Sequence, residues 1–171
     1  MLMLIQMEQY IKNKDGQILI ELIIAVAIIS IILSSTLLAV HSILQSSTLS
    51  KQKLEAKYLL QQQIESSYAI VNGSWANLQV GQYYVYYNPT NNPPTETQGW
   101  KLTPGVTTYN EYQEYVTISN VYRVNSNTVT SNSTYPYDPN TKEITATVSF
   151  LSFGNTYTYN ESIYFTNWQE Y

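Results

Sequence analysis

Apolar residues are concentrated in one stretch near the start of the chain. No charged side chain occurs in Leu22–Ser50, and the segment Leu22–Val40 is apolar on nearly every face of a helix. About 20 such residues are enough to cross the hydrocarbon core of a bilayer as a helix. Because Pro and Gly are absent between Gln17 and Asn72, the pattern predicts one continuous helix over about residues 18–70. Asn72-Gly73 is its predicted end, since both residues tolerate positive φ.

The helix becomes amphipathic after Ser50. Charged residues return on a background of Leu, Ala and Gln, while apolar residues spaced three, four or seven apart form one stripe. The stripe consists of Leu49, Ala56, Leu60, Ile64 and Val71. This half of the helix is therefore expected to bury one face.

The segment that follows Gly73 has the composition of β-strands. It is rich in Tyr, Thr, Asn and Ser, and it contains all six prolines. Tyr, Val, Thr and Ile favour strands. Five segments are predicted as strands: Gln82–Asn88, Trp100–Thr103, Gln113–Val124, Glu143–Phe153 and Thr156–Thr166. The stretches Asn88–Gly99 and Asn125–Asn140 are predicted loops.

Alternation is clearest in the fourth strand, where four apolar residues alternate with Thr and Ser. These residues are Ile144, Ala146, Val148 and Phe150, and the pattern predicts one buried and one wet face. The last two strands read as a hairpin around a turn at Gly154-Asn155. The predicted fold class is α+β, a long N-terminal helix packed on a C-terminal antiparallel β-sheet domain.

Composition and charge narrow the functional classes. The chain has 171 residues, 8 basic and 12 acidic side chains, no cysteine and one histidine. A net charge of −4 argues against nucleic-acid binding, which depends on clustered Lys and Arg. Without cysteine there is no disulfide, thiolate metal site or cysteine nucleophile. The single His41 cannot build a two-histidine metal site or a Ser/His/Asp triad, so no enzyme and no cofactor are predicted.

The residues at the start of the apolar helix form a motif. A polar leader ends at Gly16, Gln17 and three apolar residues follow, and Glu21 is the only charge before the long uncharged run. Over residues 12–45 the sequence resembles the prepilin signature of type IV pilins and type II secretion pseudopilins. The resemblance implies that a prepilin peptidase cuts after Gly16, that residues 1–16 are removed, and that the new N-terminus, Gln17, is methylated. It also implies a pilin-like fold.

Glu21 is the residue of this motif with the clearest physical role. A carboxylate one turn into an apolar helix is costly to bury without a partner. The resemblance implies that its partner is the α-amine of Gln17 on the adjacent subunit, and the helix N-terminus adds a favourable dipole. Two alternatives are an interfacial residue of an ordinary signal anchor and a cleaved secretory signal. The second fits less well because the apolar run continues to Leu44 and passes unbroken into the amphipathic helix.

The resemblance implies a domain organisation, partners and a location. The expected parts are a leader (1–16), a pilin helix (17–72, with about 18–45 in the membrane or filament core) and a β-rich head (73–171). Two further segments, Glu55–Glu65 and the closing hairpin that ends near Trp168, resemble those of minor pilins and minor pseudopilins. The implied partners are other pilin subunits, the prepilin peptidase, the inner-membrane assembly machinery and the membrane itself. The protein is then a single-pass membrane protein before assembly and part of a surface filament afterwards.

Two other functions fit the same sequence. One is a pseudopilin of a type II secretion or DNA-uptake system, which would share the processing. The other belongs to a different class, a single-pass membrane-anchored adhesin or binding module that never polymerises. Mass spectrometry separates this last alternative from the pilin hypothesis, because an anchored module would keep an intact N-terminus.

Three further features are candidate sites. Asp138, Asn140 and Glu143 could supply oxygen ligands to calcium, although Asp-Pro-Asn is also common turn chemistry. His41 is expected to pack or hydrogen-bond on the apolar helix. The strand Gln82–Asn88 carries tyrosines on both faces, which suits core packing and subunit contact or an adhesive surface.

Overall fold

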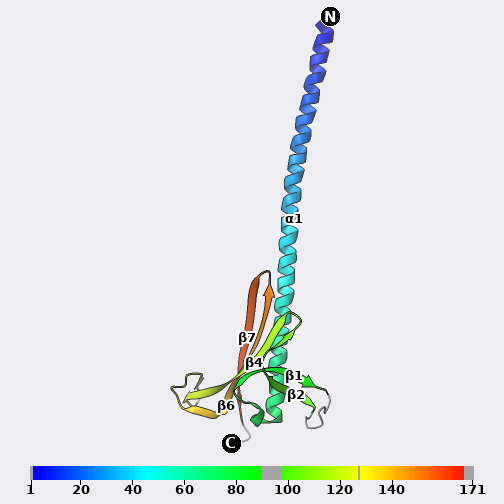
Figure 1. The fold of residues 1–171 in the computed structure, drawn as a ribbon. Helices are drawn as coiled ribbons and strands as arrows, with labels where there is room; N and C mark the ends of the chain where they lie inside the picture. Colours follow the sequence, from blue (N-terminus) through cyan, green and yellow to red (C-terminus); the bar gives the residue numbers. More distant parts are fainter. Residues whose placement is uncertain (1, 90–97, 127, 168–171) are drawn as a thin grey trace. The chain divides into compact units, whose positions relative to one another are not determined.

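The computed structural model describes residues 2–89, 98–126 and 128–167, with the backbone alone for residues 2–15. The chain divides into two units, Met1–Ser50 and Lys51–Tyr171. One long helix and an antiparallel sheet make up the fold (Figure 1), which confirms the predicted α+β class.

Helix α1 (Leu2–Gly73) ends at the predicted stop but begins earlier than predicted. The predicted start near residue 18 is wrong for this structure, because the leader is helical as well. Nothing in the leader forces a break: it has no proline, and Gly16 costs a helix only about 1 kcal/mol relative to Ala. A short 3₁₀ helix, Trp75–Asn77, follows α1.

The Lys51–Gly73 part of α1 buries the middle of the stripe that the sequence predicts, whereas Leu49 at its start is only half-buried. Ala56, Leu60 and Ile64 are buried as expected, and Leu59 joins them. Ile70 is the last buried residue, whereas Val71 is only half-buried. Polar residues complete the buried face, namely Gln63, Ser66 and Ser67.

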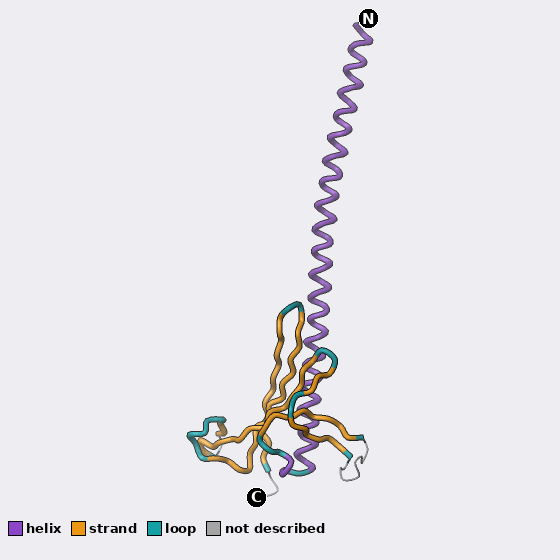
Figure 2. The backbone as a smooth tube through the Cα atoms, viewed as in Figure 1, coloured by secondary structure: helices purple, strands orange, loops and turns teal. Residues whose placement is uncertain are grey.

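Seven strands form one sheet of order β2-β1-β4-β6-β7, with β3 and β5 also paired to β4. Figure 2 shows the strands in orange and the long helix in purple. The strands are β1 (Gly81–Asn88), β2 (Gly99–Pro104), β3 (Thr107–Tyr109), β4 (Tyr112–Asn125), β5 (Thr128–Thr130), β6 (Tyr137–Ser152) and β7 (Asn155–Thr166). Every pairing is antiparallel. The five predicted strands are confirmed. Their ends differ from the predicted ones by at most one residue, except that β6 begins six residues earlier.

The predicted loop Asn125–Asn140 is wrong in part, because β5 and the first residues of β6 lie within it. Both pair with the end of β4: Tyr122 is opposite Thr130 on one side and Tyr137 on the other. Pairing with a distant strand here overrides the turn-forming composition of the segment. Of the other predicted loop, Asn88–Gly99, residues 90–97 lie outside the described part.

The hairpin between β6 and β7 turns one residue earlier than predicted. Ser152 pairs with Asn155, which leaves Phe153 and Gly154 as the two turn residues. Both have positive φ, +48° and +79°, as a type I′ turn requires. The sheet face predicted from alternation is buried, and Ile144, Ala146, Val148 and Phe150 are all at most 2% exposed.

Candidate functional site

The residues of the N-terminal motif all lie on α1. Gln17 and Glu21 are four residues apart, so they share one face of the helix one turn from each other. Both side chains are exposed, as is Gly16. A Cβ on Gly16 would meet no atom within 4 Å, so packing gives no reason for a glycine at this position.

The helix that follows Glu21 is apolar and exposed around its whole circumference. The large apolar side chains between Ile18 and Leu44 are 48–71% exposed. In the described part of the chain this is the one helix long and apolar enough to cross a membrane. A helix that is apolar on all sides is expected to be buried, in lipid or in protein.

Several polar side chains inside this segment form hydrogen bonds within the helix. Ser30, Ser34 and Thr36 donate hydrogen bonds to carbonyl oxygens four residues earlier, at 2.7–2.8 Å. His41 Nε2 lies 2.9 Å from Gln45 Nε2, in agreement with the expected hydrogen-bonding role. These contacts suit an apolar surrounding, where an unsatisfied polar group is costly.

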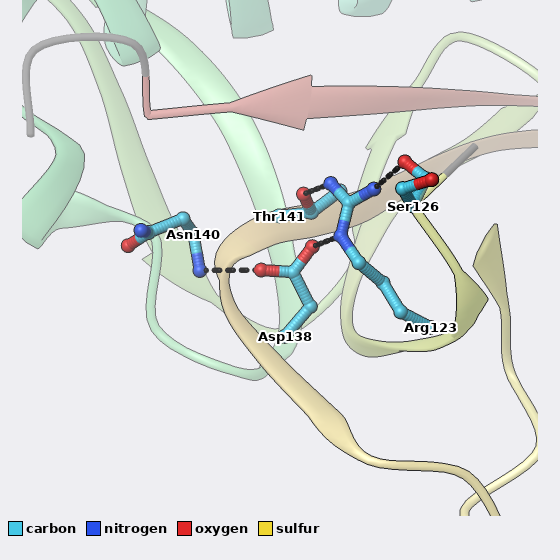
Figure 3. A network of polar contacts seen from close by, with 5 residues as sticks. All are labelled: Arg123, Ser126, Asp138, Asn140 and Thr141. Atoms are coloured by element: carbon cyan, nitrogen blue, oxygen red, sulfur yellow. Dashed lines mark hydrogen bonds and ion pairs between the residues drawn. The ribbon is translucent and has the colours of Figure 1, made fainter. Parts of the chain in front are cut away.

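The second candidate site lies where β4 meets β6 and is centred on Asp138 (Figure 3). Asn120 pairs with Lys142 and Val121 with Asp138, so β6 carries three extra residues at this bulge. The Arg123 side chain lies on the concave side of this bulge (Figure 3). Its Nε donates to Asp138 Oδ2 at 2.6 Å, its Nη1 to the Ser126 carbonyl at 2.9 Å and its Nη2 to Thr141 Oγ1 at 3.2 Å.

The calcium candidates do not converge on one point. The backbone N–H of Asn140 donates to the other Asp138 oxygen, Oδ1, at 3.0 Å. Both oxygens of the Asp138 carboxylate therefore already accept hydrogen bonds. Glu143 interacts instead with the Tyr164 hydroxyl, and burial together with that carboxylate raises the pKa of Tyr164. In the described ranges no group of three His, Cys, Asp or Glu residues is placed to hold a metal ion. The arrangement at Asp138 acts as a clamp on the bulge.

Opposing effects act on the Asp138 carboxyl. Burial would raise its pKa, but hydrogen bonds from Thr141, Arg123 and the Asn140 amide, together with the guanidinium charge, hold the pKa below its usual range. Arg123 was not among the site residues predicted from the sequence. The only feature that could have identified it is that few cations lie among the Tyr- and Thr-rich strands.

The tyrosines of β1 lie on both faces of an outer part of the sheet. Tyr84 and Tyr86 are neighbours at a ring-centroid distance of 6.2 Å, and Tyr87 packs edge-on against Trp100 of β2 at 5.3 Å. All but Tyr87 are half-buried. These contacts support the packing role, and the adhesive alternative stays a prediction.

A row of polar contacts between α1 and β4 was not predicted at all. Tyr112, which is 1% exposed, donates from Oη to Glu55 Oε2 at 3.2 Å, and burial together with the nearby Glu55 carboxylate raises its pKa. Gln52 and Gln63 each donate to a glutamate, Glu111 and Glu114 respectively. The sequence places Gln52, Glu55 and Gln63 on the helix and Glu114 on the strand, but Tyr112 lies one residue before the predicted strand, and no local pattern gives the register between the two elements.

Comparisons with known proteins add no family: no family model, curated protein or solved structure matches this chain.

Proposed function

We propose that this protein is a structural subunit, of the minor class, of a type IV pilus or a related filament. Residues 18–45 insert the chain into the membrane, a prepilin peptidase cuts after Gly16, and the exposed apolar helix then packs against other subunits in the filament core. The strand unit forms the outer surface.

One observation carries the proposal: a helix apolar on every side, with a single carboxylate, Glu21, one turn beyond the cut. The exposed side chains of residues 18–44 must find an apolar partner, and membrane lipid and neighbouring helices both supply one. Glu21 shares a face with Gln17, so the amine freed at Gln17 of a neighbouring subunit can pair with it. Packing does not explain a glycine at position 16, whereas recognition by the peptidase would explain it.

Mass spectrometry of the protein purified from its own membrane tests the proposal directly. We expect the mature chain to begin at Gln17, with an added methyl group at its amine. A mature protein that still carries residues 1–16 would overturn the pilin function and leave a membrane-anchored binding module as the better description. Expression of Gly16→Leu is the matched control, since it should keep the leader while the rest of the chain folds normally.

A further inference from the structure

Gln63 and Glu114 form a polar pair between α1 and the sheet, in which Gln63 is buried and Glu114 is half-buried. Gln63 is 5% exposed and donates from Nε2 to Glu114 Oε2 at 3.0 Å. The other end of the same amide, Oε1, is buried and has no hydrogen-bond partner. A buried polar atom without a partner destabilises the folded state, so the missing donor requires an explanation.

A neighbouring pair shows what a satisfied arrangement looks like. Gln52 also joins α1 to a glutamate near β4, donating from Nε2 to Glu111 Oε1 at 2.9 Å. Its Oε1 accepts a hydrogen bond from Ser152 Oγ at 2.6 Å. Glu111 is exposed, and both ends of the Gln52 amide have a partner. Gln63 lacks a counterpart of Ser152.

Among the residues that the structure describes, no cation is paired with Glu114, whose side-chain partner is Gln63. On the sheet it pairs with Val148 of β6 and Thr107 of β3. The Arg123–Asp138 ion pair lies elsewhere on the sheet, where the other end of β4 meets β6. The ionisable groups on these elements have other contacts or face solvent. Glu55 contacts Tyr112, Glu65 contacts Gln61, Lys53 lies over Tyr157, Lys57 lines a groove with Tyr159, Lys142 contacts Asn120, and Tyr109 is exposed.

We propose that Glu114 is a proton-binding site that locks α1 onto the sheet. In the neutral form, one carboxyl oxygen accepts the Gln63 Nε2–H while the other donates its O–H to Gln63 Oε1. The result is a closed acid–amide pair with two hydrogen bonds, in which every buried polar atom has a partner. When the proton leaves, the carboxylate can only accept, and Gln63 Oε1 loses its donor.

The electrostatic surroundings agree with this geometry. Burial raises the pKa of Glu114, and the Gln63 hydrogen bond lowers it by a smaller amount. A folded-state pKa above that of the unfolded chain, about 4.3 for glutamate, means that protonation favours the folded state. The stabilisation is complete below about pH 4.3 and is lost as the pH rises through the folded-state pKa. This proposal does not depend on the filament function.

Thermal unfolding of the full chain in detergent micelles between pH 4 and 8 tests the proposal, followed by the near-ultraviolet circular dichroism of the tyrosines. For the wild type we expect the unfolding midpoint to fall by about 2–8 °C across the titration of Glu114. Glu114→Gln replaces the acid by an amide that still donates and accepts, so it should hold the low-pH midpoint and lose this pH dependence. Glu111→Gln is the matched control and should keep the wild-type dependence.

A pH dependence of the same size in Glu114→Gln and wild type would overturn the proposal. Infrared spectroscopy of the wild type is a second readout that needs no variant. We expect the absorption of one protonated carboxyl group to persist above the ordinary range of glutamate. If all carboxyl groups titrate within that range, Glu114 is ionised in the folded state and the proposal is wrong.

Discussion

At the scale of single residues, the clamp at the β6 bulge has the clearest energetic role. Arg123 holds the bulge closed through three donors, and Asp138 is the one charged acceptor among its partners. The Asp138 side chain is 7% exposed, and that of Arg123 is 32% exposed. Solvent therefore screens the pair on the arginine side, and the hydrogen bonds matter more than the net charge attraction.

We expect Asp138→Asn to lower the free energy of unfolding by about 1–3 kcal/mol at neutral pH, because an amide nitrogen would face the Arg123 donor. The pKa of Asp138 is lowered on folding, so its contribution is present above the unfolded value of about 3.9 and is lost as the pH falls through the folded value. Urea unfolding at pH 7 and pH 3 measures both effects. The difference between variant and wild type should shrink at pH 3, and a difference that grows there would contradict the ion-pair role. Glu161→Gln, at an exposed position on β7, should change little.

Phe153 is a second residue whose backbone conformation predicts a stability change. It has φ +48° although it is not glycine, and the left-handed conformation costs most residues about 1–2 kcal/mol. Asn tolerates it better, and Asn-Gly is the preferred pair for a type I′ turn. We expect Phe153→Asn to stabilise the protein by up to about 1 kcal/mol in urea unfolding. Phe153→Ala removes the same exposed ring without this gain, and equal behaviour of the two variants would contradict the explanation.

At the scale of elements, β6 shows that two apolar residues of one strand contribute differently to stability when they lie on opposite faces of the sheet. Ile144 is 1% exposed on the face covered by α1, whereas Leu151 of the same strand is 64% exposed. We expect Ile144→Ala to cost about 2–5 kcal/mol and Leu151→Ala to stay within about 0.5 kcal/mol. Urea unfolding of the two variants tests this, and similar losses would mean that the buried face of the sheet is assigned wrongly.

The elements also show how far the sequence determines the fold. Periodicity alone identifies the buried stripe of α1 and the inner face of β6, because burial repeats with the geometry of each element. It misses β3 and β5, three-residue strands too short to show alternation and held only by pairing with β4. The bulge at Asp138 and the Gln63–Glu114 contact depend on the register between distant segments. No local pattern records such a register.

At the scale of the whole molecule, the two units have different surfaces. The Lys51–Tyr171 unit buries its apolar residues between helix and sheet, as a soluble domain does. In the described part of the Met1–Ser50 unit, the apolar side chains of residues 18–44 are exposed. A surface of this kind is far larger than the apolar patches of monomeric soluble proteins. The first unit therefore requires a surrounding that the chain itself does not provide.

Under the proposed filament function, Glu21 would meet different surroundings in the membrane and in the filament. In lipid, a carboxylate near the end of the apolar segment is tolerated, because the cost of about 2.5–3.5 kcal/mol applies to charges at the centre of a membrane-spanning helix. In a filament core it would be buried among apolar helices and would need the amine of a neighbouring Gln17. We therefore expect Glu21→Ala to insert into the membrane as the wild type does and to fail to enter filaments. Membrane fractionation and immunoblotting of sheared filaments measure the two steps separately. Glu65→Ala, an exposed carboxylate on the same helix, should pass both. If Glu21→Ala is recovered in sheared filaments at the wild-type level, the pairing with Gln17 is not what directs assembly.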